Sequence, residues 1–229
     1  MQKRSENCAR QCTSCKLSSL GKRGFTRFVD GVVGESQDVL ERHRLEGYFP
    51  NAEMRRIPAV LPGLQASAPR PFPQERPLRV GFLGLHSHFK GLAYLADAAR
   101  LLADDRSIEF HIAGEGASRD NYAEEVRARF PQHNTVFHGW VKADEFLAGI
   151  DVLAYPSIGR EAFGRSSIEA FAHAIPVIST NIGGVAENIV DGVNGFHVPP
   201  ADAAALKEAI LKTAACADRY AALSAGALA

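Results

Sequence analysis

The most informative stretch of this chain runs Asp151-Val-Leu-Ala-Tyr155-Pro-Ser-Ile-Gly-Arg-Glu161-Ala-Phe-Gly164-Arg-Ser-Ser-Ile-Glu169-Ala170. A short apolar strand is followed by a loop, a glycine and the start of a helix. Glycine marks a sharp strand-to-helix turn, and the first N–H groups of a helix have no partner inside it. Because those groups favour an anion, the stretch predicts a site for a phosphate or a diphosphate.

The same alternation of strand and helix extends in both directions from this stretch. Apolar strands are predicted over residues 78–85, 108–113, 135–137, 151–155, 176–179 and 195–198. Helices are predicted over residues 91–103, 120–130, 144–149, 164–173 and 201–215, with a helical turn over 184–190. This pattern predicts an α/β fold with a parallel sheet covered on both faces. Such sheets bind ligands beyond the carboxyl ends of their strands, at a topological switch point.

The beginning of the chain has a different character. Strands over residues 25–33 and 56–61 and a helix over residues 36–45 precede a proline-rich stretch from Pro62 to Pro77. That composition is typical of a linker. We therefore divide the chain into residues 1–76, a cysteine-containing segment with a domain remnant and linker, and residues 77–229, a ligand-binding α/β domain.

Composition excludes several classes of protein. Of the 229 residues, 46% are hydrophobic and 23% are charged, as expected for an ordinary globular chain. A formal net charge of zero argues against a general nucleic-acid binder. The chain shows neither an apolar run of about 20 residues nor a signal peptide. These features predict a cytoplasmic protein, with peripheral contact at the inner face of the membrane as an alternative.

Three cysteines near the start, Cys8, Cys12 and Cys15, are weak candidates for zinc ligands. His43 or a residue of a partner would be the fourth ligand, because a closed structural zinc site needs four. Reduced free thiols are the slightly favoured alternative, and we predict no metal site. Cys216 lies in an alanine-rich helix and is expected in the core.

Two glutamates flank the glycine turn. Glu161 precedes it, and Glu169 lies about one and a half turns into the helix. A carboxylate has two acceptor oxygens and suits a vicinal diol, so one glutamate can bind a sugar hydroxyl and the other a ribose. The alternative is a pair of solvated glutamates. Against it, Glu169 stands between apolar neighbours, where a carboxylate without a partner is costly.

Other strand ends carry weaker signals of the same kind. A lysine, Lys90, stands at a helix start after Gly84, and a cation there suits a phosphate. Gly114-Glu-Gly116 and Gly183-Gly184 follow two other strands. Taken alone, the lysine motif favours an ordinary surface lysine, and the glycine motifs are compatible with simple turns.

Together the motifs resemble the C-terminal half of retaining GT-B glycosyltransferases, and the nearest group is family 4. The resemblance covers residues 25 to about 215 and depends on this ordered set: Gly84…Lys90-Gly91, Gly114-Glu-Gly116, Phe137-His-Gly139, Asp151 to Ser157, Glu161-x7-Glu169, Pro176-Val, Gly183-Gly184-x-x-Glu187 and Gly192-x-Asn-Gly195. It implies a Rossmann-like parallel sheet, the C-terminal domain of the GT-B fold, with a partial N-terminal domain remnant.

The resemblance also implies an activity and a set of site residues. Such enzymes transfer a sugar from a nucleotide-diphosphate sugar to an acceptor such as a glycan or a lipid-linked sugar, with retention and without a required metal or cofactor. The catalytic residues would be Glu161, which binds the donor sugar, and Lys90, which binds the diphosphate. Glu169 would bind the ribose. The other donor-binding residues would be Gly84, Gly91, Gly114, Phe163, Gly164, Arg165, Ser166, Gly183 and Gly184.

The chain departs from the family pattern in three ways. Leu85 stands where the family often has an arginine, so one phosphate-binding cation is missing, and Ala174 replaces a usual glycine. Only the tail of a first domain is recognisable, so we expect a fragment or one part of a split enzyme, with a separate N-terminal domain or subunit as an open alternative.

The sequence leaves two other functions to consider. The first is a non-catalytic nucleotide-sugar-binding fragment or subunit, which would need a separate acceptor domain. The second is a dinucleotide-binding oxidoreductase. It is disfavoured because Gly81-Phe-Leu-Gly84 does not match Gly-x-Gly-x-x-Gly and no acidic residue ends the second strand.

Overall fold

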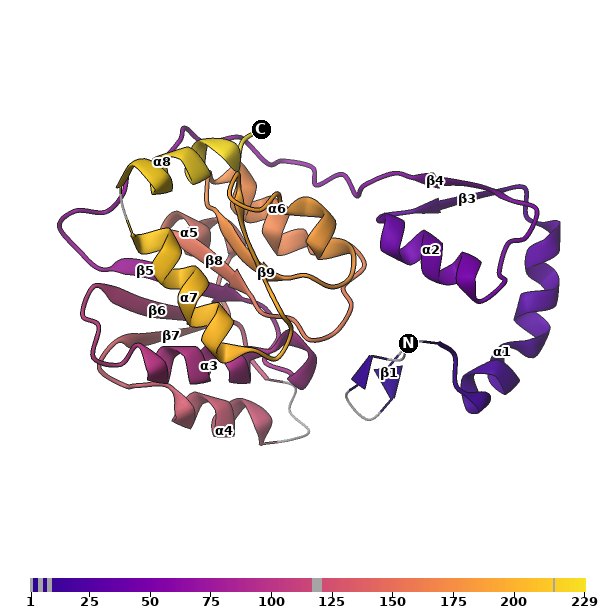
Figure 1. Cartoon of the computed structure of the whole chain (residues 1–229), viewed down its shortest axis with the longest axis horizontal. Helices are drawn as coiled ribbons and strands as arrows, with labels where there is room; N and C mark the ends of the chain where they lie inside the picture. Colours follow the sequence, from indigo (N-terminus) through magenta and orange to yellow (C-terminus); the bar gives the residue numbers. More distant parts are fainter. Residues whose placement is uncertain (1, 4–5, 8–9, 117–120, 216) are drawn as a thin grey trace.

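The structure, a computed structural model, describes residues 2–3, 6–7, 10–116, 121–215 and 217–229. Cys8 and Cys216 lie outside the described residues, so the predictions for these two cysteines are not examined by it. Figure 1 shows a large α/β domain and a smaller N-terminal part, joined by an extended segment.

The large domain is built on six parallel strands in the order β10-β9-β8-β5-β6-β7. The strands are β5 (Leu78–Leu83), β6 (Ile108–Ala113), β7 (Thr135–Gly139), β8 (Val152–Tyr155), β9 (Val177–Thr180) and β10 (Gly195–Val198). The chain runs outward from β5 to β7, returns to the other side of β5 and then runs outward from β8 to β10. The switch point therefore lies between β5 and β8, and the predicted α/β fold with a parallel sheet is confirmed.

Helices cover both faces of this sheet. They are α3 (Leu92–Leu101), α4 (Tyr122–Arg129), α5 (Ala143–Ala148), α6 (Arg165–Ala172), α7 (Ala203–Ala214) and α8 (Ala217–Gly226), with short 3₁₀ helices η2 (His88–Lys90) and η3 (Gly184–Asn188). Helices α3, α4 and α7 pack with one apolar cluster, and α5 and α6 with another. Adjacent residues of β8 alternate between the two clusters, since Val152 and Ala154 belong to the first and Leu153 and Tyr155 to the second. This two-sided burial explains the continuous apolar character of β8.

The N-terminal part contains β1 (Gln2–Lys3), β2 (Glu6–Asn7), α1 (Thr13–Phe25), η1 (Thr26–Phe28), β3 (Gly31–Gly34), α2 (Gln37–Leu45) and β4 (Glu53–Arg56). Strands β3 and β4 are parallel neighbours, and α2 lies where the sequence predicts a helix. The two predicted strands of this part are wrong in position. Thr26 is held in a turn because its hydroxyl donates to the carbonyl of Arg23. The last hydrogen bond between the chains of β3 and β4 runs from the Ile57 N–H to the Gly34 carbonyl. Pro58 cannot continue the ladder because it has no N–H.

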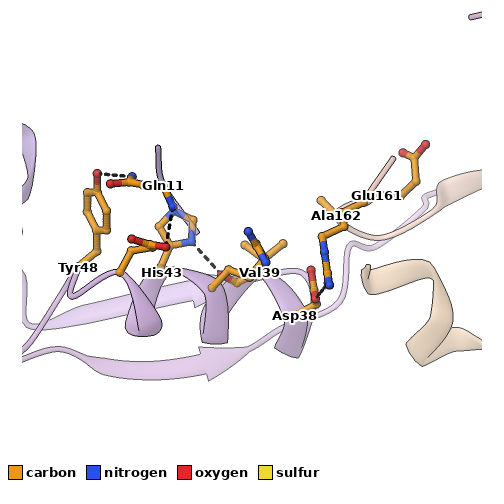
Figure 2. A pocket seen from close by; sticks show the side chains of 10 residues that line it. Gln11, Asp38, Val39, His43, Tyr48, Glu161 and Ala162 are labelled. Atoms are coloured by element: carbon orange, nitrogen blue, oxygen red, sulfur yellow. Dashed lines mark hydrogen bonds and ion pairs between the residues drawn. The ribbon is translucent and has the colours of Figure 1, made fainter. Parts of the chain in front are cut away.

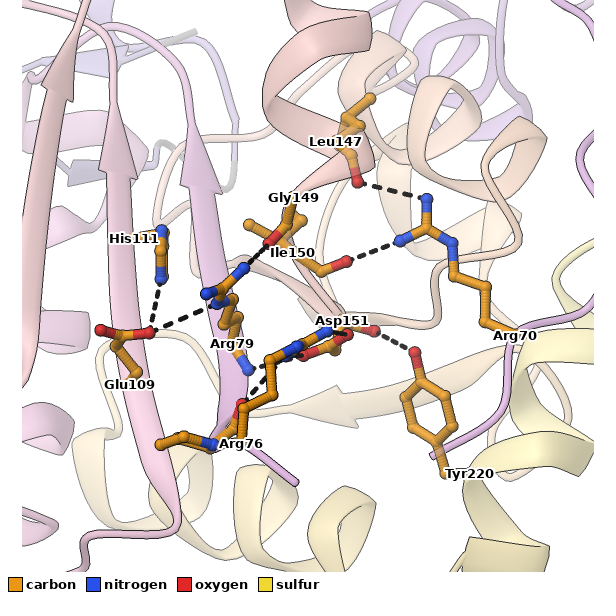
Figure 3. A network of polar contacts seen from close by, with 11 residues as sticks. Arg70, Arg76, Arg79, Glu109, His111, Leu147, Gly149, Ile150, Asp151 and Tyr220 are labelled. Atoms are coloured by element: carbon orange, nitrogen blue, oxygen red, sulfur yellow. Dashed lines mark hydrogen bonds and ion pairs between the residues drawn. The ribbon is translucent and has the colours of Figure 1, made fainter. Parts of the chain in front are cut away.

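The proline-rich segment is bound tightly to the large domain (Figure 3). The Arg76 guanidinium donates to both oxygens of Asp151, at 2.6 and 2.8 Å, and the Arg79 N–H donates to the same carboxylate at 2.8 Å. The Tyr220 hydroxyl donates to the carbonyl of Asp151 at 3.0 Å. Arg70 reaches the carbonyl of Ile150 at 2.8 Å. These contacts lie at the amino end of β8 and leave the carboxyl ends of the strands accessible.

Within the described ranges, no helix has the length and hydropathy that crossing a bilayer requires.

Candidate functional site

The loops that follow β5 and β8 meet at the switch point and bring two predicted site residues together. Lys90 Nζ lies 2.7 Å from Glu161 Oε1, and both side chains are about three-quarters buried, with 29% and 24% exposed. The loops are also joined through their backbones, because the Phe89 carbonyl accepts from Ile158 N at 2.9 Å and from Gly159 N at 3.1 Å. A cation and a carboxylate thus stand in the position where an open parallel sheet binds its ligand.

Glu161 is held from two sides. The Ser157 hydroxyl donates to Glu161 Oε1 at 3.0 Å. The Gly184 N–H donates to the Glu161 carbonyl at 2.7 Å. Ser157 is itself fixed, since it is buried and its carbonyl accepts from the Thr180 hydroxyl at 2.6 Å. These contacts orient the carboxylate before any ligand binds.

The predicted glycine turn is present at the start of α6. Gly164 has φ +81° and precedes the first residue of the helix, where no side chain forms a cap hydrogen bond. A Cβ at Gly164 would lie 2.6 Å from Val185, so η3 packs directly behind the turn. Asn188 of η3 donates to the Phe163 carbonyl at 2.6 Å. The braced turn leaves Arg165 and Ser166 at a helix start that favours an anion.

Tyr155 lies beside Lys90, and its pKa is sensitive to the charges in this region. Its hydroxyl accepts from Lys90 Nζ at 3.5 Å, and its side chain is buried. Burial and the negative charges of Glu161 and Glu169 raise the pKa of Tyr155. The phenol therefore stays neutral. Because Glu161 and Glu169 both raise the pKa of Tyr155, the two carboxylates lie in the same region of the site.

Several predicted glycines permit close backbone packing around Glu161. A Cβ at Gly91, which has φ +70°, would lie 1.9 Å from the carbonyl oxygen of Pro156. Cβ atoms at Gly183 and Gly184 would meet the backbones of Glu161 and Ala162, at 2.8 and 1.9 Å. Gly91 therefore packs against the start of the loop that follows β8, and Gly183 and Gly184 pack against the part of that loop that carries Glu161.

The other predicted glycines line a separate hollow of about 440 Å³ at the carboxyl ends of β5, β6 and β7. Its lining residues are Leu83, Gly84, Leu85, Gly114, Glu115, Gly116, Trp140 and Val141. Gly84 and Gly114 are close, since a Cβ at Gly114 would lie 1.9 Å from the Gly84 carbonyl oxygen. The sequence assigns no role to Trp140 in this hollow, or to Ser157, Asn188 and Tyr155 near Glu161. Trp140 directly follows the Phe137-His-Gly139 motif, which was a usable signal.

A further hollow, of about 380 Å³, lies between α2 and the loop that carries Glu161 (Figure 2). Asp38, Val39 and His43 line it from α2, and Glu161 and Ala162 line it from the β8 loop. Arg160 forms an ion pair with Asp38 across it. The candidate site therefore continues from Glu161 toward the N-terminal part.

Glu187 joins the two parts of the chain. Its carboxylate accepts from Gln37 N at 2.9 Å and from Asp38 N at 2.7 Å, and it pairs with Arg56 at 3.2 Å. A carboxylate on the first N–H groups of α2 satisfies groups that the helix itself leaves open. The sequence places Glu187 in an anion-binding loop, whereas in the structure it holds α2 beside the site.

The cysteine prediction can be followed only in part. Cys12 Sγ lies 3.2 Å from the Ser14 hydroxyl, and Cys12 and Cys15 flank the start of α1. Among the described residues, no group of three or more His, Cys, Asp or Glu side chains is arranged to hold a metal. Because Cys8 is not described, the zinc alternative stays untested.

An open parallel sheet with paired polar residues at its switch point is a ligand-binding α/β domain. Residues 77–215 match the family described as glycosyl transferases group 1, and the chain belongs to that family. An uncharacterized glycosyltransferase of Methanocaldococcus jannaschii is 34% identical over 123 residues, which are 52% of this chain and 31% of the relative. The 2-deoxystreptamine glucosyltransferase of Streptomyces kanamyceticus is 31% identical over 121 residues, covering 51% of this chain and 31% of the relative.

A solved structure shows the same fold. The crystal structure of an Anabaena protein in complex with UDP and glucose superposes with a TM-score of 0.78 at 20% identity, over 93% of this chain and 61% of that chain. The large domain thus has the fold of the C-terminal GT-B domain, as the sequence predicts. The chain spans less than a third of the length of the two curated relatives named above.

Proposed function

We propose that this chain is the donor-binding half of a glycosyltransferase that takes a sugar from a nucleotide-diphosphate sugar. The observation that carries the proposal is the Lys90–Glu161 pair at the switch point, with 2.7 Å between the ammonium and the carboxylate. A donor diphosphate can replace the carboxylate as the partner of Lys90. Glu161 is then released to accept hydrogen bonds from the donor sugar.

The proposed sugar transfer depends mainly on stabilising the negative charge that develops on the departing diphosphate. The bond between the anomeric carbon and the diphosphate oxygen breaks, and a new bond forms to the acceptor oxygen, whose proton passes to the departing diphosphate. The Lys90 ammonium and the N–H groups at the start of α6 would stabilise the negative charge that develops on the diphosphate. We propose retention of configuration and no required metal or cofactor. Glu169 would hold the ribose.

The acceptor is proposed to bind on the side of the site that faces the N-terminal part. The hollow between α2 and the Glu161 loop could admit a glycan or a lipid-linked acceptor beside the donor sugar. A separate N-terminal domain or subunit would complete that side, and a cytoplasmic location stays a prediction. The alternative function is a non-catalytic nucleotide-sugar binder. An assay for donor hydrolysis or sugar transfer separates the two, since a binder turns over neither.

The first test is ligand-induced stabilisation of the whole chain. The Anabaena structure contains UDP, so UDP is screened first, with GDP, ADP and NAD beside it. We expect one nucleoside diphosphate to raise the melting temperature, because a ligand at 100 times its Kd stabilises the native state by about 2.7 kcal/mol. A rise with NAD alone would contradict the proposal and favour the oxidoreductase.

Glu169→Ala tests the ribose contact. We expect nucleoside diphosphate binding to weaken by about 1–3 kcal/mol, the scale for losing hydrogen bonds to a charged group. Isothermal titration calorimetry measures the change. Glu145→Ala is the control, because Glu145 is exposed on α5. The affinity of this variant for the nucleoside diphosphate should equal that of the unchanged chain. Equal affinity in Glu169→Ala would remove the ribose assignment.

A further inference from the structure

Two cysteines occupy paired positions at the start of α1. Cys12 is the N-cap residue, and Cys15 is the third residue of the helix. Side chains at these two positions lie close together, which is why they can exchange hydrogen bonds in a capping box. Cα atoms three residues apart in a helix are separated by roughly 5 Å, and a disulfide joins Cα atoms that are about 4.4–6.8 Å apart. The start of α1 therefore brings the two cysteines within reach of each other.

The surroundings of Cys12 suit a reacting thiolate, which is the form of cysteine that attacks a disulfide. The first N–H groups of a helix stabilise a negative charge, and α1 is 13 residues long. Its first turn, from Thr13 to Lys16, contains a lysine and no acidic residue. The Ser14 hydroxyl lies 3.2 Å from Cys12 Sγ and can donate to it. These features stabilise a thiolate at Cys12 while it reacts.

The pair is also accessible. Cys12 and Cys15 both stand as thiols in the structure, and both are half-buried. Structural cysteines that do not react are normally buried among apolar side chains, so this exposure favours a reactive pair. A disulfide that is exposed is more easily reduced than a buried one, and such bonds are typically reversible.

The two cysteines lie next to the hollow between α2 and the Glu161 loop. Gln11, which directly precedes Cys12, lines this hollow together with Glu46 and Tyr48. The Gln11 N–H donates to the Glu46 carboxylate at 2.9 Å, and its side-chain amide donates to the Tyr48 hydroxyl at 3.0 Å (Figure 2). A covalent bond at Cys12 would therefore restrain the residue beside one wall of the hollow.

We propose that Cys12 and Cys15 are a redox-sensitive modification site, and that they form a reversible disulfide by exchange with a small-molecule disulfide such as oxidised glutathione. The Cys12 thiolate attacks one sulfur of the small molecule and releases one thiol. The Cys15 thiolate then attacks Cys12 in the mixed disulfide and releases the second thiol. The two cysteines lose two electrons and two protons, which leave with the two released thiols. This inference goes beyond the proposed function and does not depend on donor binding.

Mass spectrometry reads this bond directly. Trypsin cleaves after Arg10 and after Lys16, so the peptide 11–16 contains both cysteines, whereas Cys8 lies in the peptide 5–10. The whole chain is equilibrated with mixtures of reduced and oxidised glutathione, alkylated and digested. As oxidised glutathione increases, we expect the peptide 11–16 to change from doubly alkylated to unalkylated and lighter than the dithiol by two hydrogen atoms. Dithiothreitol should restore the double alkylation.

Two variants test the order of the steps. Cys15→Ser should trap glutathione on Cys12, because the thiolate that resolves the mixed disulfide is missing. Cys8→Ser is the control, and its peptide 11–16 should be oxidised at the same glutathione ratio as in the unchanged chain.

Three results would overturn the proposal. The first is a peptide 11–16 that stays doubly alkylated in a large excess of oxidised glutathione. The second is a disulfide that joins the peptides 5–10 and 11–16, since Cys8 would then be the partner. The third is a bound zinc ion that protects both thiols until a chelator removes it, which would favour the metal site instead.

Discussion

Asp151→Ala is expected to destabilise the chain by about 3 kcal/mol, the lower end of the range for breaking a buried ion pair. The Asp151 side chain is 5% exposed and accepts from Arg76 and from the backbone of Arg79. Its loss leaves a guanidinium and an N–H without their partner. The lower end applies because Arg76 is 40% exposed, so water can partly replace the carboxylate.

Urea unfolding measures this effect. Asp144→Ala serves as the control because its carboxylate is 79% exposed and pairs only with His173 at 3.2 Å in the described structure. The free energy of unfolding of that variant should fall by less than about 1 kcal/mol. Similar losses in the two variants would mean that the Arg76–Asp151 pair does not hold the proline-rich segment on the domain.

Gly91→Ala is expected to disrupt both stability and ligand binding. Gly91 has φ +70°, where an L-residue costs about 1–2 kcal/mol, and the added Cβ would lie 1.9 Å from the Pro156 carbonyl oxygen. Since that oxygen belongs to the backbone, the clash is relieved only by moving one loop. Either movement separates Lys90 from Glu161. We expect a loss of about 3 kcal/mol or more in stability and a drop of roughly 100-fold in nucleotide affinity.

The chain offers a matched control for this prediction. Gly192 has φ +78° and nothing within 4 Å of an added Cβ, so Gly192→Ala introduces the same backbone strain without a clash. Gly192→Ala should lower the free energy of unfolding by about 1–2 kcal/mol and leave the nucleotide affinity unchanged. Equal effects in both variants, measured by urea unfolding and calorimetry, would show that the packing of the two loops is unimportant.

The sequence predicts the large domain well because its signals are local. Strands buried on both faces need largely apolar runs, and the runs of β8 and β9, which bury all of their residues, are visible in the sequence, whereas the edge strand β7 buries none of its residues. The turn at Gly164 is visible for the same reason, since glycine, strand and helix are neighbours in the chain. The N-terminal part is harder. Helix α1 buries none of its residues, and its apolar side chains Leu17 and Leu20 are exposed, so no core contact accompanies it in the structure as described.

The parts of the site that could not be predicted depend on sheet order. Lys90 and Glu161 become neighbours because β8 returns to lie beside β5. No local pattern encodes that pairing, and only the family resemblance assigns both residues to one site. Ser157 and Asn188 act by holding Glu161 and the Phe163 carbonyl, roles that appear only with coordinates. Helix α8 was missed because its alanine-rich sequence has few large apolar residues, although Tyr220 and Leu223 reach the core.

The central claim is that the switch point binds a donor diphosphate, and a crystal structure of the whole chain with UDP tests it most directly. We predict phosphate oxygens within hydrogen-bond distance of Lys90 Nζ and of the first N–H groups of α6, with Glu161 no longer paired to Lys90. UDP bound elsewhere, with the Lys90–Glu161 pair intact and protein atoms against the start of α6, would contradict the account.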